Sequence, residues 1–374
     1  MENGVVENGV CSAQTASNKV SESSSVDHLV VMVHGILGRA TDWKFAAELF
    51  AQTFHDKIIV HCSERNVATL TLDGIDVMGE RLAKEVVELI HQKPSLRRIS
   101  FVAHSVGGLV ARYAIGKLYR PSMKENGDMS SSECEEERRG TIYGLEALNF
   151  ITFATPHLGS RGSKQVPFLF SVSAFEKAAS CVVHCIFGRT GRHLFLTDNV
   201  EGKSPLLKRM VEDNDEGLFM SALCSFNRRV VYSNVSYDSI LSLYLKIPIS
   251  SNILQLYNCC FPLLIHQGFV GWATSSIRCD SELPRWEKFV NCKYPHIVYE
   301  EYCNACPKLG ENIFNKLEDE LVTSLSCVSW EKVDVSFHKS WQRFAAHSVI
   351  QAKGGSKHKE GVDVIRHMLE KFLL

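Results

Sequence analysis

The sequence predicts an α/β fold in which helices flank a mostly parallel central sheet. Residues 29–33 and 99–102 are continuous apolar runs, which are typical of strands buried on both faces of a parallel sheet. Segments with helical periodicity separate such runs, as crossover connections between parallel strands require. With 374 residues, 45% of them hydrophobic and 22% charged, the chain has the length and composition of one large domain of this class.

The remaining elements follow from the same patterns in chain order. Apolar or β-branched runs predict further strands at 57–61, 147–154, 229–235 and 328–337. Helices are predicted at 79–91, which Pro94 follows, and at 107–118. A last helix near the C-terminus presents one apolar stripe, made of Val362, Ile365, Leu369 and Phe372.

The predicted domain spans residues 27–374 and follows a polar tail at 1–26. This tail lacks the basic start and apolar core of a secretory signal peptide, so we expect it to be disordered. Thirteen cysteines without such a signal indicate reduced thiols and a cytoplasmic protein, for which peripheral contact with an intracellular membrane stays open. The lone Cys303-Asn-Ala-Cys306 pair predicts no zinc site, and a net charge of −1 gives no reason to expect nucleic acid as a partner.

Residues 103–107, Ala-His-Ser-Val-Gly, place a serine on the turn between a buried strand and a helix. The usual pattern for a nucleophilic serine at such a turn is G-x-S-x-G, and Ala103 departs from it by one methyl group. A tight turn exposes the hydroxyl at a helix N-terminus, where a histidine can accept its proton. Ser105 is therefore the candidate nucleophile, and the alternative is a serine without chemistry in a glycine-rich turn.

A second motif, His34-Gly35-Ile36-Leu37-Gly38, directly follows the first apolar run. Such a turn can supply one backbone N–H group of an oxyanion hole, and the residue after the nucleophile supplies the other. We therefore expect the two donors to be Ile36 and Val106. His34 is expected to hold the loop rather than to transfer protons.

The acid and the base of a catalytic triad should follow the serine in the chain. Asp238 comes just after the strand predicted at 229–235, where an aspartate can equally well form a turn, and Asp198 and Asp215 compete with it. Two histidines follow the last predicted strand. His338 comes directly after it, whereas His347 lies on the next loop, a placement that suits a general base.

These motifs and their order resemble the family of putative serine esterases, the lipase-like intracellular α/β-hydrolases of plants and fungi. The matching stretches are Val33–Trp43, Phe101–Tyr119, Phe153–Gly162, Gly188–Asp198, Val230–Asp238 and Asp334–Lys353. The resemblance covers about residues 27–374 and implies an α/β-hydrolase fold. It favours Asp238 as the triad acid and His347 as the base, because the family motif A-H-x-x-I maps onto residues 346–350. His157, in another shared motif, is expected to shape the pocket floor.

Residues 239–267 depart from the family pattern, which continues from the triad aspartate almost directly to a motif found here at 270–278. Of these 29 residues 17 are apolar, Lys246 is the one charged residue, and two prolines argue against a membrane-spanning helix. The segment is an apolar lid, an interfacial membrane segment, or translated non-coding sequence. We favour the last because the break in the motif is abrupt. Apolar stretches within 160–225 predict a cap over the site.

Together these features predict a serine hydrolase that cleaves carboxylic esters, with lipid-like esters as substrates and transient contact with a membrane surface. Acyl transfer from Ser105 requires no metal and no organic cofactor. The alternative is a catalytically weak or inactive isoform that binds a lipid or another small ligand in the same pocket. An acyltransferase would share the acyl-enzyme.

Overall fold

The computed structural model describes residues 26–122, 140–160, 187–200, 202–236, 270–288, 291–307 and 316–374. In this part of the chain seven strands form one sheet, in the order β10-β11-β9-β6-β3-β1-β2. Neighbouring strands are parallel except for β10 and β11. The mostly parallel sheet that the sequence predicts is thus confirmed. Its strands are β1 His28–Val33, β2 Ile58–Cys62, β3 Arg98–His104, β6 Glu146–Phe153, β9 Arg228–Asn234, β10 Ile297–Cys303 and β11 Trp330–Val335.

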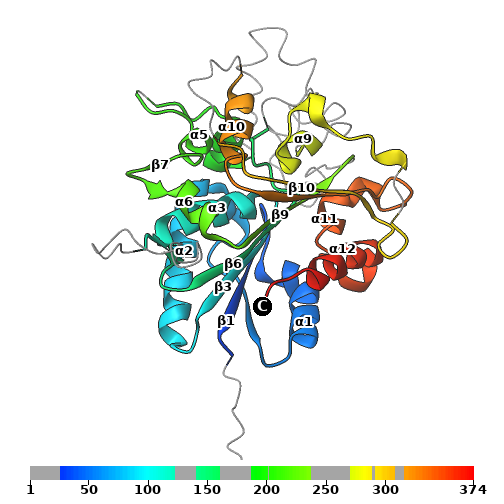
Figure 1. The fold of residues 1–374 in the computed structure, drawn as a ribbon, viewed down its shortest axis with the longest axis horizontal. Helices are drawn as coiled ribbons and strands as arrows, with labels where there is room; N and C mark the ends of the chain where they lie inside the picture. The colour runs from blue at the N-terminus through cyan, green and yellow to red at the C-terminus, as the bar shows by residue number, and fades with distance from the viewer. Residues whose placement is uncertain are drawn as a thin grey trace, which may run out of the picture.

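Helices cover both faces of this sheet (Figure 1). One face carries α2 (Ile75–Gln92) and α3 (Val106–Leu118), and the other carries α1 (Lys44–Thr53) and α12 (Lys359–Glu370). Shorter elements lie between the strands and along the carboxyl edge of the sheet. They are α5 Leu206–Arg209, α6 Phe219–Ser225, α9 Trp272–Ser276, α10 Leu317–Leu325 and α11 Ala346–Val349, with the two-residue strands β4 Tyr119–Arg120, β5 Thr141–Ile142, β7 Asp213–Asn214 and β8 Gly217–Leu218.

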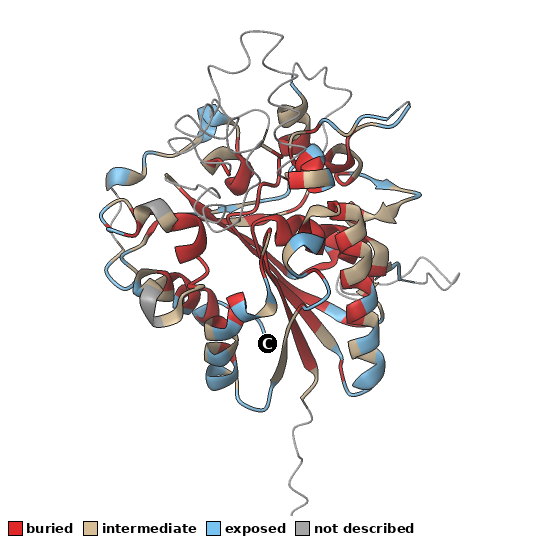
Figure 2. Ribbon diagram, turned by 180° about the vertical axis from the view of Figure 1, so that it is seen from behind, coloured by how far each residue is buried: buried red, intermediate tan, exposed pale blue. Residues whose placement is uncertain are grey.

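The apolar strands separate two hydrophobic cores. Successive side chains of a strand point to opposite faces, so Leu29 and Val31 of β1 join the core under α2 and α3. Val30 and Met32 join the core under α1 and α12. Figure 2 shows the strands buried between these helical layers. This burial on both faces is why the strands are continuous apolar runs.

Helix α2 begins at Ile75, four residues before the predicted start at Gly79. Its first backbone donors find partners far away in the chain. The N–H of Gly74 donates to Thr190 Oγ1 at 3.0 Å, and that of Ile75 donates to His193 Nδ1 at 3.1 Å. These long-range contacts satisfy donors that every helix leaves open at its N-terminus, so the shared 188–198 motif acts here as a helix cap.

Other elements differ from the sequence prediction in smaller ways. The edge strand β10 and the helices α1 and α10 were not predicted. In α12, Val364 and Met368 complete the buried stripe with Ile365 and Leu369, whereas Val362 is only partly buried. The predicted tail, the insert at 239–267 and Asp238 lie outside the described residues. Of the predicted cap, residues 187–194 are helical and α5 and α6 are described, and its role remains a prediction.

No helix in the described ranges is both long enough and apolar enough to cross a lipid bilayer.

A buried ion pair joins the 270–278 motif to the sheet. Asp334 of β11 is fully buried, and Arg278 Nη1 lies 2.9 and 3.0 Å from its two carboxylate oxygens. The indole Nε1 of Trp272 donates to the same carboxylate at 2.7 Å. These contacts fix α9 on the end of β11, because a buried carboxylate needs both charge and hydrogen-bond compensation.

We predict that Arg278→Met lowers the free energy of unfolding by about 3–5 kcal/mol, because it leaves a buried carboxylate without its cation. The matched control is Arg65→Met, which removes an exposed ion pair with Glu88 and should cost about 1 kcal/mol or less. Denaturant unfolding of both variants measures the difference. Equal losses of unfolding free energy in Arg278→Met and Arg65→Met would contradict a structural role for the buried pair of Arg278 and Asp334.

Candidate active site

The predicted nucleophile Ser105 lies between the end of β3 and the start of α3, with φ 54° and ψ −134°. Residues other than glycine rarely adopt this conformation. Three neighbours hold it in place. The N–H of Ser105 donates to the carbonyl of Phe153 at 2.8 Å, and its own carbonyl accepts from Thr155 Oγ1 and the N–H of Gly108, at 2.8 and 3.0 Å. Strain that neighbours maintain in this way is characteristic of functional turns.

The turn after β1 packs directly against this serine turn. A Cβ atom on Gly35 would lie 2.8 Å from Ser105 Cβ, and one on Gly107 would lie 2.5 Å from the carbonyl oxygen of His34. Side chains at these two positions would therefore separate the segments. The glycines of the two motifs bring the candidate oxyanion loop and the serine into contact.

The structure brings Ser105 and His347 together, although 241 residues separate them in the chain. Ser105 Oγ and His347 Nε2 lie 2.9 Å apart, and both side chains are buried. His347 belongs to α11, which follows β11 at the carboxyl edge of the sheet. Both residues line a cavity of about 10 Å³, which is about the space that one water molecule needs.

The backbone around Ile36 is oriented as an oxyanion donor would be. The carbonyl of Gly35 accepts hydrogen bonds from the N–H of Gly38 at 3.1 Å and from His34 Nδ1 at 3.0 Å. Because the two polar groups of a trans peptide point in opposite directions, this turns the N–H of Ile36 away from the loop. Ile36 and Val106 are buried, yet neither N–H donates to an acceptor within the described ranges. Buried donors without acceptors are rare.

His104, which the sequence analysis did not single out, contacts the segment that carries His347. Its Nε2 lies 2.6 Å from the carbonyl oxygen of His347, so this nitrogen carries the ring proton and donates it. Burial, with the neighbouring His347, holds the pKa of His104 well below its usual range, and the ring is neutral. His104 therefore positions the backbone of the segment that carries His347. In the sequence, the one indication of this contact was that His104 directly precedes Ser105.

An ion pair connects the loop after β1 to the same segment. Lys353 Nζ lies 2.7 Å from Asp42 Oδ2, and both residues line the cavity at Ser105. Asp42 also accepts the backbone N–H of Arg39 at 3.3 Å. The pair thus connects the two chain segments that hold Ile36 and His347. His34, bonded to the carbonyl of Gly35, has its pKa lowered by burial, in line with a structural role.

The competing aspartates do not contact His347. Asp198 accepts the N–H of Leu206 at 2.8 Å and lies 3.9 Å from His193 Nε2. Asp215 lies on the turn between β7 and β8, away from the cavity at Ser105. The predicted acid Asp238 lies outside the described residues, four positions after the end of β9.

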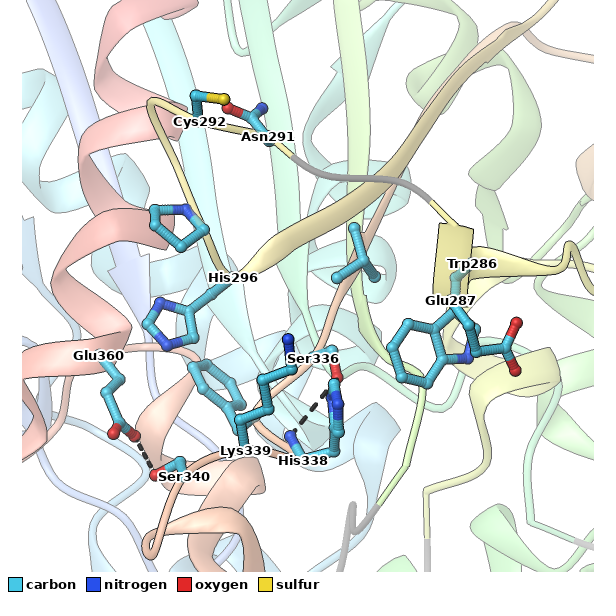
Figure 3. A pocket seen from close by; sticks show the side chains of 13 residues that line it. Trp286, Glu287, Asn291, Cys292, His296, Ser336, His338, Lys339, Ser340 and Glu360 are labelled. Carbon is cyan, nitrogen blue, oxygen red and sulfur yellow. Dashed lines mark hydrogen bonds between the residues drawn. The ribbon is translucent and has the colours of Figure 1, made fainter.

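The alternative base His338 lines a different cavity, of about 440 Å³ (Figure 3). Its Nδ1 lies 2.7 Å from Ser336 Oγ, and its ring meets the edge of Trp286 at 5.0 Å. His157 is buried against Trp330, with Nε2 2.9 Å from Thr152 Oγ1, and is not among the residues that line the cavity at Ser105. Of the histidines considered from sequence, His347 is the one in contact with the serine.

Comparisons with known proteins identify the family of this chain. Residues 23–251, more than half of the chain, match the sequence family described as "Putative serine esterase (DUF676)". "Putative lipase ROG1" of Saccharomyces cerevisiae is 30% identical over 225 residues, which are 58% of this chain and 28% of that protein. "Putative lipase C4A8.10" of Schizosaccharomyces pombe is 27% identical over 230 residues, covering 58% of this chain and 26% of that protein. The chain thus spans less than a third of the length of these relatives.

Among solved structures, a phospholipase PlaB from Legionella pneumophila in complex with thio-NAD aligns with a TM-score of 0.35 and 12% identity. The alignment covers 56% of this chain and 38% of that one.

We predict that Lys353→Met slows the reaction of Ser105 with a fluorophosphonate probe by about tenfold to a hundredfold, because small displacements of reacting groups have effects of this size. Lys353→Arg keeps the charge and should restore most of the rate. Lys293→Met removes an exposed ion pair with Glu370 and serves as the control. Equal rates for Lys353→Met and the parent chain would show that the pair does not position the site.

Proposed function

Because this chain belongs to the family of putative serine esterases, we propose that it hydrolyses carboxylic esters, with lipid-like esters as substrates. The observation that carries the proposal is the contact of 2.9 Å between Ser105 Oγ and His347 Nε2, on a strained turn beside two buried N–H groups. The names of the curated relatives, which are putative lipases, support the choice of lipid-like esters. We further propose a cytoplasmic protein that contacts membrane surfaces transiently.

In the proposed mechanism His347 Nε2 accepts the proton of Ser105 as its oxygen attacks the ester carbonyl. The carbonyl oxygen becomes an oxyanion, which accepts hydrogen bonds from the N–H groups of Ile36 and Val106. His347 then gives its proton to the leaving alcohol as the C–O bond breaks, leaving an acyl-enzyme. A water molecule repeats the cycle, releases the acid and restores Ser105. The cavity at Ser105 has about the volume that this water requires.

We assign the triad acid to Asp238, which would hold the tautomer of His347 and stabilise its protonated form. Strand β9 ends at Asn234, and the N–H of Val235 donates to the carbonyl of Val335 at the end of β11. The described chain thus reaches the same edge of the sheet as Ser105 at residue 236, two positions before Asp238. The engagement of Asp198 with Leu206 and His193 supports the assignment.

The first test is labelling of the full chain with a fluorophosphonate, beside Ser105→Ala and a version without residues 239–267. We expect labelling of the full chain that is lost in Ser105→Ala, followed by turnover of lipid esters in a substrate screen. Labelling only after the deletion would show that the insert disables an otherwise competent site. If no folded version is labelled, the hydrolase proposal fails and ligand binding without turnover replaces it.

We predict that Asp238→Asn lowers kcat for an ester about a thousandfold or more with little change in KM, because the amide favours the wrong tautomer of the histidine. Asp215→Asn is the matched control and should keep the parent rate. Steady-state kinetics with a soluble chromogenic ester measures both. A normal kcat in Asp238→Asn would exclude this residue as the acid.

A further inference from the structure

Trp341 is the most exposed of the large apolar side chains in the described ranges, at 84%. It lies on the loop between β11 and α11, six residues before His347. A fully exposed indole has an unfavourable contact with water, and tryptophan is concentrated where membrane meets water, because its ring is apolar and its N–H is polar. An exposed tryptophan is therefore a candidate contact for such an interface.

The segment around Trp341 is strongly basic, although the whole chain has a net charge of −1. Residues 336–359 contain five Lys and Arg residues and neither Asp nor Glu. Lys353 is paired with Asp42. Lys339 and Lys359 are exposed and pair with no carboxylate of the described ranges. Positive charge is thus presented on both sides of Trp341 in the sequence.

A hydrogen bond brings these residues to one corner of the molecule. Ser340 Oγ donates to the Glu360 carboxylate, which ties the loop carrying Trp341 to the start of α12, where Lys359 lies. We call Lys339, Trp341 and Lys359 the Trp341 corner. Because β11 is parallel to β9, and through β9 and β6 to β3, this corner lies at the same edge of the sheet as Ser105.

The cavity of about 440 Å³ adjoins the Trp341 corner and has a size typical of ligand pockets. Figure 3 shows the Lys339 side chain extending into the space between His296 and Trp286. The Glu360 carboxylate at its edge is engaged by Ser340, and His296 Nδ1 is held by Asp363 at 3.0 Å. The Glu287 carboxylate lines the same cavity, so Lys339 shares its wall with two carboxylates.

We infer that the Trp341 corner docks on a bilayer that contains anionic phospholipid, with Trp341 inserted at the interface and Lys339 and Lys359 near the lipid headgroups. Each lysine near a negatively charged membrane adds to the attraction, and an interfacial tryptophan adds apolar contact. Docking in this orientation turns the edge of the sheet with Ser105 toward the lipid. The docking is inferred from the exposed residues of the Trp341 corner alone. That docking supplies substrate to Ser105 rests on the proposed ester hydrolysis.

The test uses the full chain carrying Ser105→Ala, so that hydrolysis does not alter the lipid. Flotation with vesicles of phosphatidylcholine alone is compared with vesicles containing equal parts of phosphatidylserine and phosphatidylcholine. We expect binding only to the latter, weakened by salt and by about fivefold for each of Lys339→Gln and Lys359→Gln. Brominated lipid chains should quench tryptophan fluorescence, and Trp341→Ala should remove this quenching.

Two controls lie at the opposite edge of the sheet. Lys57 precedes β2 and Tyr302 lies near the end of β10, and both side chains are exposed. The variants Lys57→Gln and Tyr302→Ala should therefore leave vesicle binding unchanged. Absence of binding to anionic vesicles, or binding that the Lys339, Lys359 and Trp341 variants leave unchanged, would overturn the inference. With Ser105 intact, the docking variants should keep their turnover of a soluble ester. If the parent chain does not hydrolyse the soluble ester, the result counts against the proposed function and not against docking.

Discussion

The strained backbone at Ser105 is the constraint on which the surrounding structure depends. A positive φ at a residue other than glycine costs on the order of 1–3 kcal/mol and persists only when neighbours enforce it. Here the enforcing groups are the carbonyl of Phe153, the hydroxyl of Thr155 and the N–H of Gly108. The turn also leaves no room for side chains at Gly35 and Gly107. The glycines at these two positions are thus consequences of one sharp turn.

The parallel sheet converts this local turn into an assembled site. Parallel strands deliver their carboxyl ends to one edge, so the segments after β1, β3 and β11 meet there. The contacts that hold the segments in register are few and specific: His104 to the carbonyl of His347, and Lys353 to Asp42. They position groups more than two hundred residues apart in the chain.

Much of this arrangement could be predicted from the sequence, for physical reasons. Strands buried on both faces are continuous apolar runs, and the small residues around Ser105 reveal the turn that they permit. The start of α2 could not be predicted, because its donors bond to Thr190 and His193 rather than to a local cap. The edge strand β10 has two consecutive glutamates, Glu300 and Glu301, at its centre and so lacks a continuous apolar run. The role of His104 depends on a carbonyl brought in by folding.

The residues around Ser105 lower the free energy of unfolding, whereas the rest of the domain raises it. The strain at Ser105 and the burial of the Ile36 and Val106 N–H groups both oppose folding. The apolar cores on the two faces of the sheet offset these costs, because β3 and β1 are packed against helices on both sides. In the proposed mechanism a substrate oxygen accepts hydrogen bonds from the N–H groups of Ile36 and Val106. In that mechanism these donors bind the developing oxyanion better than the neutral carbonyl it forms from, which is what catalysis requires of them.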